Sequence, residues 1–201
     1  MGGTVTPVVC TVFGVKLGHM DLLAVLVIVV ALLVLLPFIF VKGKDAPFVP
    51  TEEEAVERIM EIAEVGANDI FYDLGSGDGR LVIAAAVRGA KAVGIEMNPL
   101  RVWYSRIMIA VLGQWQRARI IQSDFFNVDL SEATVIVLYL LPKANEDLKD
   151  KLLRELRKGA RLVTVAFPIS GFELVKEDPR GVVYGPVRLY KVPEFSPTSV
   201  L

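Results

Sequence analysis

The side chains best placed to do chemistry in this sequence surround one glycine-rich stretch. Residues 73–80 read Asp-Leu-Gly-Ser-Gly-Asp-Gly-Arg. Glycine lets a turn bring its backbone close to a ligand, as happens where nucleotide cofactors meet the carboxyl edge of a parallel sheet. Carboxylates at Asp73 and Asp78 flank this turn and would repel an anionic pyrophosphate. They suit a ligand that carries a cationic amino group.

The spacing of the glycines separates two candidate cofactors. A dinucleotide-binding turn follows the pattern G-x-G-x-x-G, whereas here Gly79 comes one residue early and Arg80 stands where that pattern has glycine. The methionine end of S-adenosylmethionine carries the amino group that the two carboxylates favour. We therefore expect S-adenosylmethionine as the cofactor, bound by the loop residues Asp73, Gly75, Ser76, Gly77, Asp78 and Gly79.

Two further carboxylates follow the next two predicted strands. Glu96 ends the second strand, where a carboxylate can accept hydrogen bonds from both ribose hydroxyls. Asp124 follows the third strand and could accept from an adenine amino group, with Phe125 covering the ring. Taken alone, the glycine turn could be a simple chain reversal and Asp124 a cap of the next segment. The ordered set favours a cofactor site, which we extend to the neighbouring residues Met97, Asn98 and Ser123.

The elements that must position these residues alternate between strand and helix. The first predicted helix opens with a capping box of Thr51 and Glu54 and runs to Gly66. Further helices are expected over residues 81–87, 98–111 and 145–156. Five buried strands are expected over residues 70–74, 92–96, 119–121, 134–141 and 161–167, and two shorter ones over 172–175 and 187–192. This order predicts an α/β, Rossmann-like, doubly wound and mostly parallel sheet with an antiparallel edge.

An apolar run precedes this domain. Residues 22–41 carry no charge and include a single proline, and twenty residues of helix span about 30 Å, the thickness of a bilayer core. We expect an N-terminal segment over 1–21, a transmembrane helix over 22–41, a linker over 42–50 and the globular domain over 51–201. Lys42 and Lys44 follow the run, so the positive-inside rule places the domain on the cytoplasmic side of a membrane.

Composition excludes several classes of function. The chain has one cysteine, Cys10, and one histidine, His19, and both precede the apolar run. The domain therefore has neither a thiol nor an imidazole for a metal site or a nucleophile–histidine pair, and no metal is expected. The net charge of −1 gives no electrostatic footprint for nucleic acid, so no nucleic-acid partner is expected.

Residues 47–168 resemble a class I (seven-β-strand) methyltransferase. Within that superfamily they are similar to the membrane-associated protein-lysine methyltransferases whose eukaryotic members act in mitochondria on the ADP/ATP translocase and the ATP synthase c-subunit. Compact archaeal protein-lysine methyltransferases look similar. The resemblance rests on Pro47-Phe-Val-Pro50, the 73–80 loop, Ala92-Val-Gly-Ile-Glu96, Asn98-Pro99, Val102-Trp-Tyr-Ser-Arg106, Ser123-Asp124, Gly159-Ala-Arg161 and Phe167-Pro168. It departs after Pro168, where family members carry a tryptophan and this chain has Ile169-Ser-Gly171.

The resemblance implies a protein-lysine N-methyltransferase that acts on a membrane or membrane-proximal protein and contacts the bilayer through residues 22–41. Residues expected on the substrate side are Phe48, Pro50, Trp103, Tyr104, Pro142 and Phe167. The lysine must lose a proton before it attacks, and a backbone carbonyl, the Tyr139 hydroxyl or a water path could accept that proton. Two alternatives remain open: a methyltransferase for a lipid or quinone-like molecule, and a non-catalytic cofactor-binding module.

Overall fold

The structure is a computed structural model that describes residues 24–30, 52–182 and 185–192. The chain divides into two units, Met1–Val41 and Lys42–Leu201. In the first unit, residues 24–30 are helical and exposed. None of the helices among the described residues combines the length and the apolarity needed to cross a bilayer. Most of the predicted span over 22–41, the linker over 42–50 and Thr51 of the predicted capping box lie outside the described residues.

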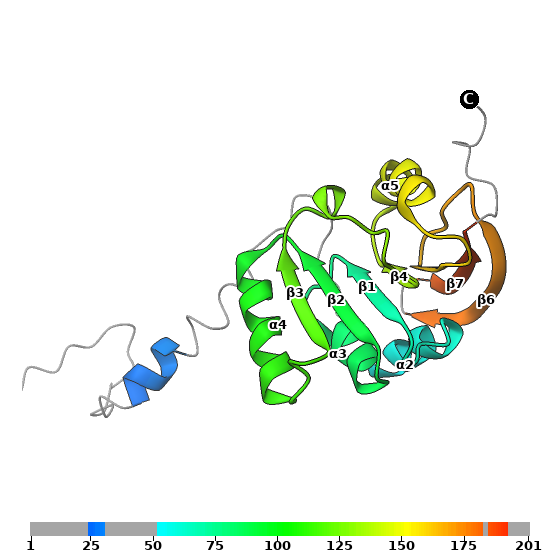
Figure 1. The fold of residues 1–201 in the computed structure, drawn as a ribbon. Helices are drawn as coiled ribbons and strands as arrows, with labels where there is room; N and C mark the ends of the chain where they lie inside the picture. Colours follow the sequence, from blue (N-terminus) through cyan, green and yellow to red (C-terminus); the bar gives the residue numbers. More distant parts are fainter. Residues whose placement is uncertain (1–23, 31–51, 183–184, 193–201) are drawn as a thin grey trace, which may run out of the picture. The chain divides into compact units, whose positions relative to one another are not determined.

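The second unit is built on one seven-stranded sheet (Figure 1). The strands are β1 (Ile70–Leu74), β2 (Lys91–Glu96), β3 (Ala118–Gln122), β4 (Val135–Leu138), β5 (Arg161–Val165), β6 (Glu173–Val182) and β7 (Gly185–Lys191). Their order in space is β3-β2-β1-β4-β5-β7-β6. The first five pair in parallel, and β7 is antiparallel to both of its neighbours. The predicted mostly parallel sheet with an antiparallel edge is confirmed.

Helices cover both faces of this sheet. They are α2 (Glu53–Ile62), α3 (Arg80–Val87), α4 (Pro99–Val111) and α5 (Pro142–Glu155), with a short 3-10 turn η1 (Phe125–Asn127). Buried residues of α2, α3 and α4 belong to one apolar cluster with the sheet, and those of α5 belong to a second cluster. Strands flanked by helices on both faces present the carboxyl ends of β1 to β5 along one edge, where ligands bind in such folds.

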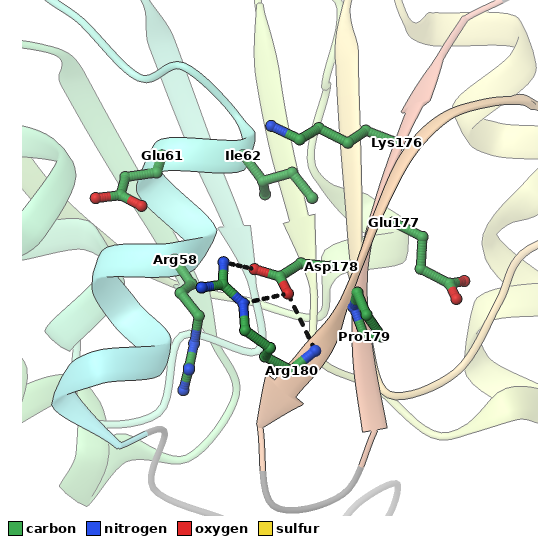
Figure 2. Close-up of a pocket in the computed structure, with 8 residues that line it drawn as sticks. All are labelled: Arg58, Glu61, Ile62, Lys176, Glu177, Asp178, Pro179 and Arg180. Carbon is green, nitrogen blue, oxygen red and sulfur yellow. Dashed lines mark hydrogen bonds and ion pairs between the residues drawn. The ribbon is translucent and has the colours of Figure 1, made fainter.

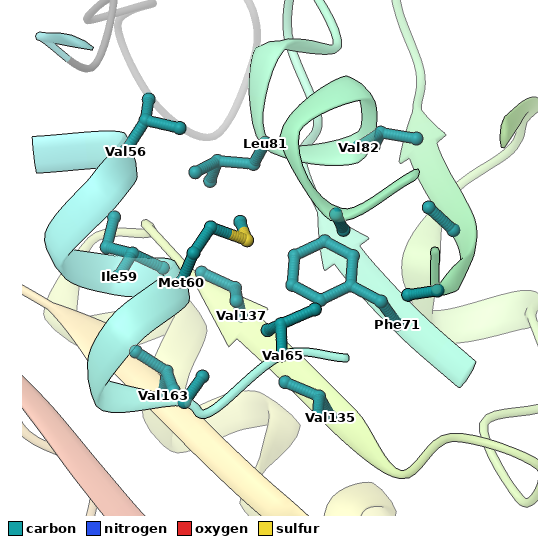
Figure 3. Packing of buried hydrophobic residues seen from close by; sticks show 14 of the residues in the cluster. Val56, Ile59, Met60, Val65, Phe71, Leu81, Val82, Val135, Val137 and Val163 are labelled. Atoms are coloured by element: carbon teal, nitrogen blue, oxygen red, sulfur yellow. The ribbon is translucent and has the colours of Figure 1, made fainter. Parts of the chain in front are cut away.

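The first cluster is packed around Phe71 of β1 (Figure 3). In Figure 3 Met60 of α2 and Val135 of β4 lie beside this ring, and Val82 of α3 belongs to the same cluster; each of the three is at most 1% exposed. Complete burial of such a side chain contributes about 1.5–3 kcal/mol to folding. The packing therefore fixes α2 and α3 against the strands that carry the glycine loop.

Several boundaries differ from the sequence-based expectation. Strand β4 ends at Leu138 rather than at residue 141, at the point where its neighbour β1 also ends, since Leu138 pairs with the last β1 residue, Leu74. Helix α5 then begins at Pro142, whose fixed φ suits the first turn of a helix. Helix α2 has Glu52 as its N-cap and shows no side-chain capping bond. Strand β6 is longer than expected and contains Pro179, which an edge strand tolerates because one side of its backbone has no ladder partner.

Candidate functional site

The carboxyl group of Asp73 is almost completely buried near the end of β1. Asp73 is 3% exposed, and its backbone pairs with Gly94 of β2 and Val137 of β4 in the middle of the sheet. Burial raises the pKa of Asp73 to about 8, and the nearby negative groups Asp78 and Glu96 act in the same direction. An ionised Asp73 is therefore unfavourable in the free protein, and a cation bound beside it would relieve that cost.

The glycine loop folds back onto the end of β2. The backbone N–H groups of Gly75 and Ser76 both donate to the carbonyl of Ile95, at 2.8 and 3.0 Å. Ser76 is buried beneath this turn, at a point where Gly94 provides the space: a Cβ on Gly94 would lie 2.6 Å from the Ser76 hydroxyl oxygen. The loop and the second strand thus fit together only because residue 94 has no side chain.

Glu96 ties this loop to the beginning of α4. Glu96 is 6% exposed, and its carboxylate accepts hydrogen bonds from the N–H of Gly77 at 3.0 Å and from the N–H of Asn98 at 2.8 Å. Arg101 lies 3.9 Å from the same carboxylate. Each carboxylate oxygen has a further lone pair, so Glu96 can still accept hydroxyl protons. It has a structural task in addition to the one predicted for it.

A second tie comes from Ser105, which sequence reasoning did not assign to the site. The Ser105 side chain is completely buried, and its hydroxyl lies 3.0 Å from the carbonyl of Gly77 and 2.8 Å from that of Arg101. Gly79 has a φ of +81°, and a Cβ there would meet the Ser105 Cβ at 3.0 Å. A serine on the buried face of the predicted helix, between Val102 and Ile109 at helical spacing, was the available signal.

Asp78 has a partner within the loop itself. Both of its carboxylate oxygens accept from the Arg80 Nε, at 3.0 and 2.9 Å, and the two side chains form an ion pair. Hydrogen bonding to Asp78 raises the pKa of Arg80. Arg80, which stands where a dinucleotide pattern has its third glycine, thus neutralises Asp78. Asp73 has no such arginine partner in the loop and is the carboxyl group left to pair with a cationic ligand.

The expected adenine side lies beside Glu96. The N–H of Ser123 donates to the Glu96 carbonyl at 3.2 Å, which brings the end of β3 next to the end of β2. Asp124 caps η1, because its side chain accepts from the N–H of Phe126 at 2.9 Å. Phe125 is half-buried, and its ring centroid lies 4.9 Å from that of Phe126. The capping role that the sequence left open is present, and the second Asp124 oxygen stays available for a ligand.

The predicted acceptor-side residues gather where β4 and β5 end. Tyr139 follows β4 directly and is half-buried, Pro142 opens α5 and is exposed, and Phe167 follows β5 and is half-buried. Asn145, which the sequence analysis did not single out, connects them. It is completely buried on α5 and donates to the carbonyls of Phe167 and Pro168 at 3.2 and 3.5 Å. The spacing of Asn145, Leu148 and Leu152 places this amide on the apolar face of its helix.

Other predicted residues are placed differently. Trp103 is 60% exposed on the outer side of α4, and Met97 is 46% exposed. Tyr104 is half-buried and its phenol interacts electrostatically with Arg80, which places it near the glycine loop. Phe48 and Pro50 lie outside the described residues. Trp103 therefore does not line the site with the side chains named above, whereas the position of Tyr104 agrees with a role beside the loop.

A separate pocket of about 310 Å³ lies between α2 and β6 (Figure 2). Hydrogen bonds from Arg180 lower the pKa of Asp178 to about 2, and the pair fills the middle of the view. The lining mixes both charges and includes none of the loop residues: Arg58, Glu61, Ile62, Lys176, Glu177, Asp178, Pro179 and Arg180. Among the described residues no cluster of histidine, cysteine, aspartate and glutamate could hold a metal ion.

The loop, Asp73, Glu96 and Asp124 fit S-adenosylmethionine. Asp73 is a buried carboxyl that could pair with the cationic methionine end, Glu96 has lone pairs that could accept from a ribose, and Asp124 has one that could accept from a base. The turn residues Gly75, Gly77 and Gly79 all have positive φ, a conformation that favours glycine. Because glycine has no side chain, a ligand can approach the backbone of this turn closely. Carboxylates dominate this set, which suits a cationic ligand better than a pyrophosphate and agrees with the cofactor expected from the sequence.

Comparisons with known proteins agree with this geometry. The model of the ANTKMT methyltransferase domain matches residues 73–176, just over half of the chain. A protein-lysine N-methyltransferase of Saccharolobus islandicus is 48% identical over 128 residues, which cover 63% of this chain and 80% of that protein. The human lysine N-methyltransferase of the ATP synthase c-subunit is 38% identical over 122 residues, which cover 61% of this chain and 52% of that protein. The chain thus spans about half the length of the human relative.

A solved structure shares both fold and sequence with this chain. An RNA methyltransferase from Salinibacter ruber, crystallised with S-adenosyl-L-homocysteine, has a TM-score of 0.69 and 39% identity. The similarity covers 73% of this chain and 95% of that one. S-adenosyl-L-homocysteine is the product that S-adenosylmethionine leaves once its methyl group has been transferred. The chain therefore belongs to the ANTKMT methyltransferase domain family and is an S-adenosylmethionine-dependent methyltransferase.

Proposed function

We propose that this methyltransferase modifies lysine side chains of proteins and that its targets lie at a membrane. The observation that carries the lysine assignment is the 48% identity to a protein-lysine N-methyltransferase over 128 residues. The human relative is named for a lysine of the ATP synthase c-subunit. The acceptor side of this chain also suits an amine, because it presents a phenol and backbone carbonyls.

The cofactor supplies an activated methyl group on a sulfonium, and the protein must align an acceptor with it and exclude water. A lysine amine has an ordinary pKa of about 10.4 and must be neutral to attack. Apolar surroundings lower that pKa, and Tyr139 and Phe167 provide them at the ends of β4 and β5. Asn145 fixes the direction of the Phe167 carbonyl, which makes this oxygen a candidate to hold the incoming amine beside the Tyr139 hydroxyl.

The membrane part of the proposal rests on the sequence that precedes the domain. An apolar run over residues 22–41 is long enough to cross a bilayer, and Lys42 and Lys44 favour the cytoplasmic side for the domain after it. The first helix of the domain begins at Glu53. The eleven residues between them, 42–52, reach at most about 40 Å, so an anchored domain stays at the bilayer face. Tethering raises its effective concentration toward targets in the same membrane.

RNA is the acceptor that a different relative suggests. The Salinibacter ruber structure is called an RNA methyltransferase. In the present chain, however, the net charge is −1, whereas a protein that binds RNA through its phosphates carries a clear excess of basic residues. We therefore retain lysine as the acceptor and treat RNA, like a lipid or quinone-like molecule, as an outcome that the experiment must separate.

The experiment incubates native membranes with the full chain and S-adenosylmethionine labelled in the methyl group. Protein, lipid and RNA are then separated, and the label in each fraction is counted. The proposal predicts label in the protein fraction that resists lipid extraction and ribonuclease. A Glu96→Ala variant is the matched control for methyl transfer by other enzymes in the membranes. Label that follows the lipid or the RNA would refute the lysine assignment, while the cofactor assignment would stand.

A further inference from the structure

The outer face of α4 is apolar although it faces away from the sheet. Val102, Ser105 and Ile109 form the buried side of this helix. On the opposite side, residues spaced by three, four and four positions form one stripe, because such spacings share a helix face. These residues are Leu100, Trp103, Ile107 and Val111, which are 42, 60, 39 and 72% exposed.

Two more exposed apolar side chains lie in the turn that follows the helix. Leu112 is 49% exposed and Trp115 is 68% exposed, and both lie just beyond Val111. Both tryptophans of the chain are thus exposed, one on the helix and the other in the turn that follows it. We call it the α4 face and define it as the exposed side chains of Leu100, Trp103, Ile107, Val111, Leu112 and Trp115. An apolar patch of this kind on a globular domain marks a surface that another molecule covers.

The charged residues of α4 and of the segment that follows it are all basic. Between residues 97 and 123 the sequence contains four arginines and neither aspartate nor glutamate. Arg106 and Arg117 are exposed, although the chain as a whole has a net charge of −1, whereas Arg119 alternates with Ala118 and Ile120 and so belongs to the face of β3 away from α4. Arg106 reaches across to the Ile120 carbonyl at 2.9 Å and Arg117 to the Gly89 carbonyl at 2.7 Å, so both guanidinium groups are held at the rim while keeping their charge.

We propose that the α4 face is a peripheral docking surface for an anionic lipid bilayer. An amphipathic helix with tryptophan and aliphatic side chains on one face and basic residues at its border lies in the plane of the lipid headgroups. Tryptophan is enriched at that depth because its ring is amphipathic. A second copy of the chain fits less well, since a two-fold contact through this face would place arginines of one copy against those of the other.

Docking through this face would orient the active site. Helix α4 begins directly after Glu96, at the carboxyl edge of the sheet, and lies beside the outermost strand β3 (Figure 1). A helix lying flat in the headgroup layer would hold the glycine loop about one helix diameter, or about 10 Å, from the lipid. The surface itself does not depend on the identity of the methyl acceptor, and its test needs no methylation.

The two tryptophans provide the measurement. The full chain is reconstituted into vesicles of phosphatidylcholine with or without phosphatidylglycerol, with ordinary or brominated acyl chains, which quench tryptophan on contact. Since both tryptophans lie on the α4 face, we expect the brominated anionic vesicles to remove about half or more of the emission. Each exposed arginine contributes about fivefold to affinity for an anionic surface, so quenching should be clearly weaker on pure phosphatidylcholine.

Two variants make the result specific. Ile107→Glu combined with Val111→Glu places two negative charges on the α4 face and should abolish the quenching. Val175→Glu changes an exposed residue on β6, at the opposite end of the sheet, and should leave the quenching unchanged. Unaltered S-adenosylmethionine binding verifies that each variant is folded.

Three outcomes would overturn the proposal. They are equal emission of the wild type in ordinary and brominated vesicles, equal quenching of wild type and of the double variant, and equal quenching on anionic and uncharged vesicles. If tryptophan emission is the same in all vesicles but changes with protein concentration, the α4 face is instead a contact with a second copy of the chain.

Discussion

Replacing Asp73 by asparagine should make the free protein more stable and at the same time remove its cofactor affinity. Asp73 is 3% exposed, and burial together with Asp78 and Glu96 raises its pKa to about 8, against 3.8 as the ordinary value. The folded chain thus binds this proton more tightly than the unfolded chain. Its contribution to stability is complete below about pH 4 and is lost as the pH rises through about 8.

The size of the effect follows from that pKa. Each pH unit between the two pKa values corresponds to about 1.4 kcal/mol, so the free protein should lose about 4 kcal/mol from this group between about pH 5 and pH 9. Carboxylates whose pKa is lowered, such as Asp178 beside Arg180, stay ionised throughout this window and leave the slope unchanged. The Asp73→Asn variant carries no titrating group at this position, so its stability should be nearly flat over the same range.

The assay is denaturant unfolding of the cofactor-free protein at pH 5, 7 and 9, followed by circular dichroism. Calorimetry then measures S-adenosylmethionine binding to wild type in buffers of different ionisation enthalpy. Because binding of a cation favours ionised Asp73, about one proton should leave on binding at about pH 6–7, and none at pH 9. Asp150→Asn, an exposed carboxyl on α5, is the matched control. Parallel stability curves for wild type and Asp73→Asn, or binding without proton release, would refute the role assigned to Asp73.

Two further predictions follow from the contacts around the site, and a third follows from the apolar run that precedes the domain. Glu96→Ala removes an acceptor that serves two backbone N–H groups as well as the ribose, so calorimetry should show cofactor affinity weaker by about 1.5–3 kcal/mol or more; unchanged affinity in a folded variant would contradict the assignment. Gly75→Val places a branched side chain at a φ of +88° and close to Leu140, so cofactor protection against heat should vanish while far-ultraviolet circular dichroism stays near wild type; protection by NADH instead would favour a dinucleotide. Residues 46–201 alone should bind S-adenosylmethionine as the full chain does but methylate native membranes more slowly at equal amount, and equal rates would remove the argument from tethering.

The alternation of elements and the glycine loop were predictable because local patterns determine them. Apolar positions of α2 recur at helical spacing, and β1 and β2 read as short, largely apolar runs bounded by charged residues or glycine. The loop was recognisable because its backbone conformation requires glycine: Gly75 and Gly79 both have a positive φ. Asp73 and Glu96 were placed correctly at the ends of adjacent strands, since parallel strands end at one edge.

Other features depend on contacts that no local pattern contains. The pairing of Asp78 with Arg80 decides which of the two loop carboxylates remains for a cation. From the sequence alone, Asp78 and Arg80 could equally well both be solvated without contacting each other. The double task of Glu96 requires knowing that the Gly77 N–H lies 3.0 Å away. Trp103 was expected beside the substrate, but it lies on the outside of α4, because helical periodicity cannot tell which face of an apolar helix meets the sheet.

The sequence carries a signal for the start of α5 at Pro142. Pro142 has the residue type that helices prefer in their first turn, and the helix begins there rather than at Asn145. Because α5 begins three residues before Asn145, Asn145 lies inside the helix and on its buried face. Its contact with the Phe167 carbonyl then follows from the adjacency of β4 and β5.

The most direct test of the account is the chemical identity of the methylated product. Native membranes are treated with the full chain and S-adenosylmethionine carrying a deuterated methyl group, and their proteins are digested and analysed by tandem mass spectrometry, with Glu96→Ala as the control. We predict deuterated methyl groups on lysine side chains of membrane proteins, present with wild type and strongly reduced with the variant. Label confined to lipid or RNA, or label on proteins that is equal for wild type and Glu96→Ala, would contradict the proposal.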